Sequence, residues 1–495
     1  MPADFAHAMT LALLPEAMLA GTALISALLA VLRPGLRPDI HRWIACIGLV
    51  GSLASCALVL LGLRHVRSGV AITVWNGGFV VDSFALFIAI LACVTALCTC
   101  LISDSAVRNI PSRSSAFYAL ILVSTAAAEA IAAEREMTTM FVALALLLVC
   151  LVALGALVKT NPRGAVSSFE HLIEGSIGLA AVLYGLALLY GVTRSTNLAT
   201  VAAFVSASPG VIALGVALVI LGLCGTFGVF PLRQWVGRVA SNVPASAAGF
   251  IVSMSLIAGG AALARVTVAR LGPDVGIWRW LVPIVAAVAL GHASLSSLKE
   301  TTVSRLIGQL VSTQAAMLLL GLLAFTTGSR GLPAYGVTAF LSGLGVTAIA
   351  TVAAFGVLAM IQVAGIGDAI ENVRGLGHRS APAALMLTVA VATLAGIPPL
   401  AGFLSRVLVI SSAADTHYGW LAVVAVGATV LTVIAAVRFI ATLYADAVDE
   451  VPFTLGATPL LSRVVAGAAC LAGVALVVLI QPLLAVATAG AGTLR

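Results

Sequence analysis

Glu129 stands out among the ionisable residues of this chain because it interrupts an apolar run, AAAEA, at residues 126–130. A carboxyl inside a membrane is costly in its charged form, so an acid in such a run favours its neutral form and is a candidate proton carrier. The alternative is that Glu129 lies one helical turn from the membrane surface and reaches water beside Glu134 and Glu136. The sequence leaves both interpretations open.

A second acidic group consists of Glu170 and Glu174, with His171 beside the first acid. At positions i and i+4 the two carboxyls share one helical face, so their repulsion favours one bound proton, which the histidine could exchange. The structural alternative is that Ser167-x-x-Glu170 is a capping box, because acids are favoured at the start of a helix.

Arg406 follows an expected helix break at Pro398 and Pro399. Arginine holds its proton too tightly to relay it. Its side chain would therefore bind carbonyls freed by the break, pair with an acid on a facing helix, or extend to the membrane surface. Three secondary candidates are Glu16 and Asp82, which lie near expected helix starts where the dipole alone explains an acid, and Arg438, which could be a structural pairing residue.

The sequence gives little support for metal binding, ATP-driven transport or nucleic-acid binding. All eight cysteines fall in apolar segments, and Cys98-x-Cys100 has no second pair at ligand spacing, so the sequence predicts no metal site. No G-x-x-x-x-G-K-[ST] loop occurs, which excludes an ATP-driven transporter of that type. The 25 Lys and Arg residues are scattered through short loops, which argues against nucleic acid as a partner.

Composition shows which elements must position these residues. The chain is 61% hydrophobic and 9% charged, with a mean hydropathy of +1.17, whereas soluble proteins carry roughly 25% charged residues. A spanning helix needs about 20 apolar residues, and the apolar runs lack the alternation of barrel strands. The fold class is therefore membrane all-α, with about fourteen expected spans: 12–33, 43–63, 79–102, 114–133, 137–158, 169–193, 210–230, 244–264, 277–296, 303–326, 335–363, 382–411, 419–445 and 464–489.

Two of these spans contain breaks that lie five helices apart. One is GVFP at residues 228–231, ending in Pro231, and the other is AGIPP at residues 395–399. Proline removes a backbone donor and frees carbonyls that need protein or water partners. Interrupted helices at matching places in two halves indicate an ion path.

The loops indicate topology and organisation. Loops after odd-numbered spans hold more basic residues than the others, so these loops are expected in the cytoplasm and both termini on the outer side. Residues 1–10 lack the basic start of a cleavable signal peptide. No long polar linker occurs, so residues 1–495 are expected to form a single polytopic membrane domain.

Seven segments carry a resemblance that extends over nearly the whole chain. The segments are residues 13–16 (LLPE), 81–84 (VDSF), 186–197 (LALLYGVTRSTN), 229–235 (VFPLRQW), 301–321, 394–403 (LAGIPPLAGF) and 437–439 (VRF). With these segments, the sequence resembles subunit N of NADH-quinone oxidoreductase, complex I, and its family, which includes Mrp-type antiporter and group 4 hydrogenase membrane subunits.

The resemblance implies an internal organisation. It implies two inverted five-helix repeats, helices 4–8 (residues 113–265) and helices 9–13 (residues 277–447), with broken helices 7 and 12. Residues 1–112 would hold helices 1–3, and residues 463–495 helix 14. It also implies a location in a bacterial inner membrane, beside other membrane subunits. NADH, quinone, flavin, iron-sulfur or nickel-iron centres would be bound only by those partners, and this chain would be a non-catalytic subunit without a cofactor.

The family's proton route through buried glutamate, lysine and histidine is where this chain departs. Ala145 stands at the glutamate position, Thr226 and Leu256 at two lysine positions, and Gln314 at the histidine position. Two further lysine positions hold Glu170 and Arg406. These replacements predict a degenerate or rerouted proton channel and a structural or coupling role in a redox-driven complex.

Two alternatives remain at this stage. One is a stand-alone or Mrp-like antiporter whose buried acids bind protons or monovalent cations, although the missing lysines disfavour it. The other is a membrane partner in another ion-coupled system, such as inorganic carbon uptake.

Overall fold

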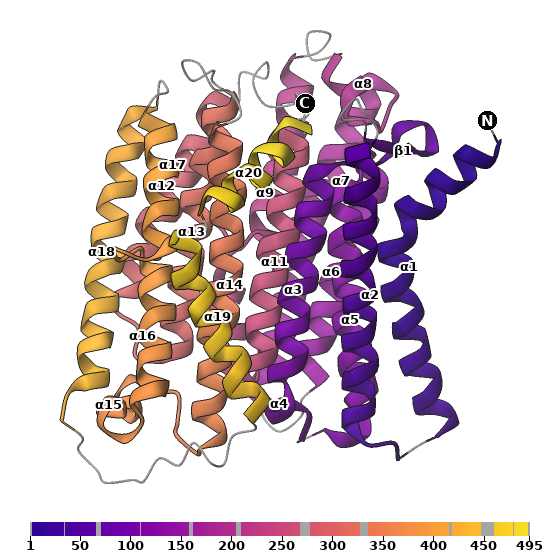
Figure 1. The fold of residues 1–495 in the computed structure, drawn as a ribbon. Helices are drawn as coiled ribbons and strands as arrows, with labels where there is room; N and C mark the ends of the chain where they lie inside the picture. The colour runs from indigo at the N-terminus through magenta and orange to yellow at the C-terminus, as the bar shows by residue number, and fades with distance from the viewer. Residues whose placement is uncertain are drawn as a thin grey trace.

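A computed structural model of the chain describes all residues except 1, 34, 66–70, 109, 158–161, 204–208, 268–277, 327–334, 415–417, 447–459, 479, 494 and 495. The described residues form a bundle of long helices that run between two opposite ends (Figure 1). The predicted repeat limits 277 and 447 lie outside the described residues.

Helices account for most of the described chain. Their bounds are α1 Pro2–Leu32, α2 Pro38–His65, α3 Ser83–Ile102, α4 Asp104–Arg108, α5 Ser114–Ala133, α6 Met137–Leu157, α7 Pro162–Thr193, α8 Leu198–Ala203, α9 Pro209–Thr226, α10 Gln234–Asn242, α11 Ala245–Val266, α12 Trp278–Ser297, α13 Val303–Thr326, α14 Tyr335–Val363, α15 Leu376–Arg379, α16 Ala381–Ala395, α17 Ala401–Ala414, α18 Gly419–Tyr444, α19 Leu460–Val478 and α20 Ile480–Thr493. The strands β1 Ile72–Val74 and β2 Phe79–Val81 pair antiparallel at one end of the bundle (Figure 1).

Length and composition confirm the predicted membrane all-α fold. Within the described part of the chain, 11 helices are long and apolar enough to cross a membrane, and further apolar helices are shorter. Each expected span contains at least one helix. The twelfth consists of two helices, α16 and α17, and the last of α19 and α20.

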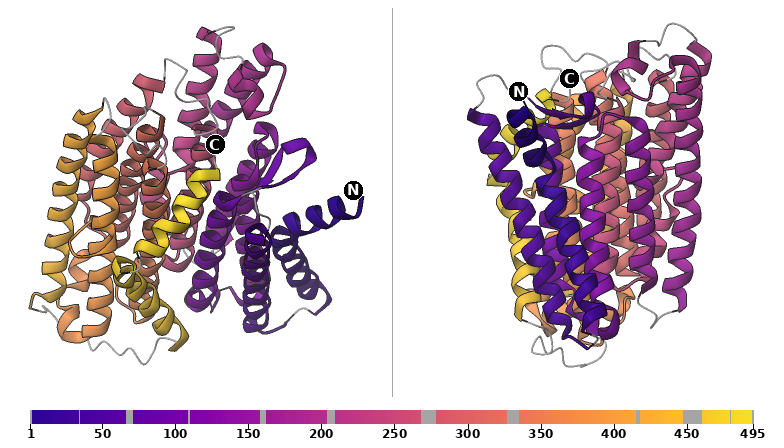
Figure 2. Two further views of the ribbon diagram at one scale, coloured as in Figure 1. Left: turned by 45° about the horizontal axis from the view of Figure 1, so that its top comes forward. Right: turned by 90° about the vertical axis from the view of Figure 1, so that its right-hand side faces the viewer.

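Three helices form the centre of the bundle. The most apolar window is 100% buried in α11 and 94% buried in both α13 and α14, against 22% in α1 and α7. Lipid tails are as apolar as a protein interior, so an apolar side chain gains no hydrophobic free energy by moving from lipid into the bundle. Close packing of small residues therefore holds such helices together. The two further views place α1 and α18 on opposite sides of the molecule (Figure 2).

Glycines bring α7 and α9 into close contact. A Cβ on Gly185 would lie 2.5 Å from the carbonyl oxygen of Gly215, and one on Gly222 would lie 2.3 Å from that of Gly178. Neither space can hold a methyl group, so the two backbones pack directly against each other.

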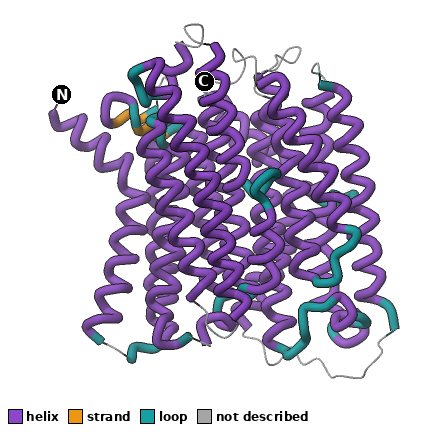
Figure 3. Tube along the Cα trace, turned by 180° about the vertical axis from the view of Figure 1, so that it is seen from behind, coloured by secondary structure: helices purple, strands orange, loops and turns teal. Residues whose placement is uncertain are grey.

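Loops interrupt helices inside the bundle as well as at its ends (Figure 3). The first break separates α9 from α10 and has Gly228 at φ 76°, and the second separates α16 from α17 and has Gly396 at φ 77°. Such positive φ values favour glycine. Phe230-Pro231 and Pro398-Pro399 are cis peptide bonds. The start of α1 and the end of α20 lie at the same end of the bundle (Figure 1).

Candidate functional site

A small cavity occupies the first break, beside Thr226, where the resemblance implies a lysine. Its volume is about 20 Å³, and the lining polar groups include His171, Thr226, Trp235 and Ser255. The remaining wall is largely leucine, from Leu144, Leu147, Leu148, Leu151 and Leu179. A cavity needs roughly 10–15 Å³ and several polar partners to hold one water. This space is large enough for about one water molecule, and leucine forms much of its wall.

A second cavity lies beside the first, between α11 and α13, and Trp235 lines both. Its volume is about 10 Å³, and Leu256 and Ser312 contribute to its wall. The resemblance implies a lysine at position 256, whereas Leu256 is a buried apolar side chain here. Both cavities at the first break are therefore small and mostly apolar.

His171 is buried and stacks on the indole of Trp235, with ring centroids 4.1 Å apart and ring planes 10° apart. The capping-box interpretation of Ser167 and Glu170 is wrong, because α7 begins at Pro162 and both residues lie within the helix. Ser167 Oγ instead accepts a hydrogen bond of 2.8 Å from Asn242 Nδ2. His171 is thus positioned by α10, which follows the first break.

Glu170 and Glu174 share one cation. Arg238 of α10 forms an ion pair with Glu170, with Nε and Oε2 2.8 Å apart, and a second ion pair with Glu174. Glu174 also accepts a hydrogen bond from the backbone N–H of Trp235 at 3.1 Å. The positive charge of Arg238 thus offsets part of the repulsion that the sequence predicts between the two acids, and the bound proton stays a prediction. Both acids therefore bind α7 to α10, the helix that follows the first break.

Arg406 spans the second break. It is 1% exposed, and its Nη2 donates to the carbonyl oxygen of Leu394, at the end of α16, at 2.8 Å. Nε donates to Gln314 Oε1 at 2.8 Å and Nη1 to Thr432 Oγ1 at 2.9 Å. Among the three alternatives left by the sequence, the structure has Arg406 bind a carbonyl freed by the break.

Gln314 completes this second cluster. It receives a hydrogen bond from Arg406 and donates from Nε2 to Ser405 Oγ at 3.4 Å. An amide cannot exchange a proton as an imidazole does. The cluster that the structure describes here is a fixed set of hydrogen bonds around one permanent charge.

Glu129 lies far from both breaks, on α5 where it faces α2 and α3. It is 2% exposed, and its Oε1 accepts from Ser52 Oγ at 3.1 Å and from Cys93 Sγ at 3.0 Å. Both partners come from helices distant in sequence. Of the two interpretations left open by the sequence, the one in which Glu129 reaches water is wrong, because the side chain is buried. Its role as a proton carrier stays a prediction.

Asp82 and Arg265 form a buried ion pair that the sequence analysis missed. Arg265 Nη1 and Nη2 lie 2.7 and 2.8 Å from the two carboxylate oxygens of Asp82, and Arg265 Nε donates to the carbonyl oxygen of Ala132. Asp82 also accepts from the backbone N–H of Ala85, as expected for an N-cap. A possible signal was the arginine at the end of an apolar run, which was assigned to a loop.

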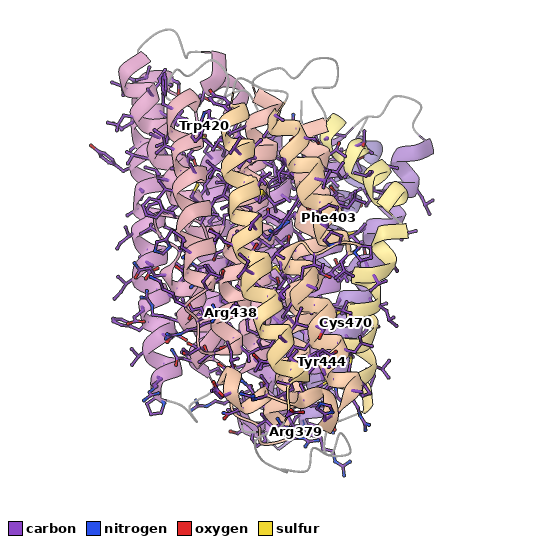
Figure 4. All side chains as sticks on the ribbon, turned by 90° about the vertical axis from the view of Figure 1, so that its left-hand side faces the viewer. Arg379, Phe403, Trp420, Arg438, Tyr444 and Cys470 are labelled. Atoms are coloured by element: carbon purple, nitrogen blue, oxygen red, sulfur yellow. The ribbon has the colours of Figure 1, made fainter. Side chains whose placement is uncertain are left out.

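The other secondary candidates occupy different places. Glu16 lies well inside α1, which begins at Pro2, so the expectation of an acid at a helix start is wrong. Arg438 is an exposed residue of α18 (Figure 4). A polar group that the sequence analysis assigned to a loop is His292, whose Nδ1 accepts from Arg233 Nε at 3.1 Å.

Comparison with known proteins identifies the family. Residues 135–432, more than half of the chain, match the family described as NADH:quinone oxidoreductase/Mrp antiporter, TM. The chain belongs to this family. The resemblance inferred from the sequence is thereby confirmed.

Curated relatives and solved structures agree with this assignment. NADH-quinone oxidoreductase subunit N 1 of Opitutus terrae is 32% identical over 84% of both chains, and subunit N of Sphingopyxis alaskensis is 28% identical over 90% of this chain and 93% of its own length. A chain of respiratory complex I from Thermus thermophilus has a TM-score of 0.78 at 24% identity, covering 95% of this chain and 98% of that one. A chain of the archaeal membrane-bound sulfane sulfur reductase has a TM-score of 0.83 at 23% identity, covering 97% of both. These two structures establish the fold.

Proposed function

We propose that this protein is an antiporter-type membrane subunit of a redox-driven, proton-translocating complex and that its own central proton route is interrupted. Family membership and the similarity to subunit N support the first part. The partners are then other membrane subunits, which carry the redox centres, and this chain binds no cofactor itself. Its role is to pack against these subunits and to couple their movements.

The cavity at the first break carries the second part of the proposal. A lysine or glutamate relay needs ionisable groups linked by water, whereas this cavity has Thr226 and a largely leucine wall and a volume of about 20 Å³. His171, the ionisable side chain that lines it, is stacked on Trp235. At the second break, Arg406 holds its proton too tightly to pass it on.

We also propose that both termini face the outer side of the inner membrane. The short helices α4 and α15, which contain or adjoin basic residues, lie at the end of the bundle opposite the start of α1 (Figure 1). Arg265 follows an even-numbered span but is buried in an ion pair with Asp82, so it does not count among the loop cations of the outer side. Without it, the excess of basic residues on the cytoplasmic side is larger.

Affinity purification of a tagged chain from its native membrane in mild detergent tests the assembly. The expected result is a stable complex that contains further membrane subunits and redox-active subunits. A parallel purification of Gly185→Ala, in which the packing of α7 is disturbed, shows how a chain with a damaged fold behaves. Comparison with it distinguishes loss of the fold from absence of partners. Recovery of the intact chain alone, with sodium-dependent proton release from vesicles, would instead identify an antiporter.

A further inference from the structure

Glu129 belongs to neither break and lies where its own helix, α5, packs against α1, α2 and α3. α5 carries Glu129, α2 brings Ser52, and α3 brings Cys93. α1 packs along α5 and brings Glu16, whose carboxyl is close enough to interact electrostatically with that of Glu129. Two acids of neighbouring helices therefore influence each other where the first three spans pack against the fourth.

Each of these acids has an oxygen without a partner. Glu129 Oε1 accepts two hydrogen bonds, whereas the Oε2 atoms of Glu129 and Glu16 are buried and have no hydrogen-bond partner among the described residues. An unpaired buried carboxylate oxygen is costly. A proton on the pair supplies the donor that these oxygens lack.

No positive charge in the described surroundings compensates two ionised carboxyls. The neighbouring titratable groups are Cys56 on α2 and Cys93 on α3, both uncharged as thiols. α6 carries one thiol, Cys150, and no charged side chain. Arg265 of α11, which also packs against α5, is bound to Asp82 and to the carbonyl oxygen of Ala132.

We propose that Glu129 and Glu16 form a proton-binding site in which Glu129 is held as a neutral carboxylic acid. Oε1 is then its carbonyl oxygen, which accepts from Ser52 and Cys93, and Oε2 carries the proton. Glu134, which directly follows α5, interacts electrostatically with Glu16. This proposal concerns the protonation state of Glu129 in the resting protein and does not depend on the proposed function.

A proton fits this site better than a sodium ion. Sodium needs several oxygen ligands around one point, whereas the two partners of Glu129 Oε1 are one hydroxyl, of Ser52, and one thiol, of Cys93. A thiol is also a poor ligand for a hard cation. The site is therefore built to stabilise a carbonyl oxygen.

Infrared spectroscopy of the full chain in lipid nanodiscs at pH 7 tests the proposal. The difference spectrum between wild type and Glu129→Gln is expected to show the C=O band of one protonated carboxylic acid. The control Glu371→Gln removes an exposed acid and is expected to leave this band unchanged. A wild-type spectrum identical in this region to that of Glu129→Gln would overturn the proposal.

A second variant keeps the test valid if Glu129→Gln does not fold. Ser52→Ala retains the acid and removes one hydrogen bond to its carbonyl oxygen, so the band is expected to move to higher frequency. An unshifted band would contradict the assignment. Loss of the wild-type band when choline in the buffer is replaced by sodium would show a cation site and would also overturn it.

Discussion

Arg406 lies at the second break, at a position where the resemblance implies a lysine. Arg406 donates to a carbonyl oxygen, an amide oxygen and a hydroxyl, and each of these acceptors belongs to a different helix. A lysine has one nitrogen and cannot reach three such groups in a fixed plane. Arg406 is therefore a structural clamp between these three helices.

Arg406→Met is therefore expected to lower stability, because it leaves Leu394 O and Gln314 Oε1 without their donor. Each unsatisfied buried group costs about 1–3 kcal/mol, although removal of a buried charge offsets part of this loss. Thermal unfolding in detergent measures the effect. Arg438→Met, at an exposed position of α18, is the matched control, and an equal loss in both variants would contradict the clamp.

Glu134 gives a pH dependence outside the spans. Burial raises its pKa from 4.5 to about 7, the hydrogen bond from Thr139 opposes this shift, and Glu136 adds to it. Between pH 4.5 and about 7 the folded chain binds a proton that the unfolded chain has lost, so this contribution to stability falls as pH rises through 7.

Glu134→Gln is expected to reduce the fall in melting temperature between pH 5 and pH 8, because it removes the group that titrates. Glu371→Gln, at an exposed position, serves as the control. Parallel pH profiles for wild type and Glu134→Gln would be evidence against this assignment.

At the scale of elements, local patterns predicted the spans and the breaks, because apolar length and proline are properties of neighbouring residues. They failed where partners are distant in sequence. Asp82 was explained by the helix dipole alone, yet it also binds Arg265, 183 positions away. The capping box at Ser167 failed for a related reason, since the polar start of α7 extends the helix beyond its apolar part.

The packing of α7 against α9 leads to a prediction for one element. Gly185→Ala places a methyl group 2.5 Å from the carbonyl oxygen of Gly215 and must separate the two helices. Overpacking of this kind costs about 1–3 kcal/mol. Gly191, on the same helix, has open space around it, so Gly191→Ala is expected to be neutral or slightly stabilising. Thermal unfolding of the two variants in parallel measures the difference, and similar losses would argue against direct backbone contact.

The whole molecule keeps the family fold, while the resemblance implies different chemistry at its relay positions. The departures at Ala145, Thr226, Leu256 and Gln314 were visible in the sequence, but their consequence needed the structure, which shows a leucine-rich cavity at the first break. Losing buried ionisable groups removes a cost of about 2.5–3.5 kcal/mol for each uncompensated charge at mid-membrane. The fold can therefore persist without its usual relay.

The most direct test is the number of protons moved per electron pair by the purified complex in sealed vesicles. His171 is the ionisable side chain that lines the cavity at the first break, and phenylalanine in its place retains the stack on Trp235. If the proton route of this chain is interrupted, wild type and His171→Phe are expected to have the same proton-to-electron ratio, once assembly of both complexes has been verified. A ratio reduced by the share of one pumping subunit would contradict the interrupted route.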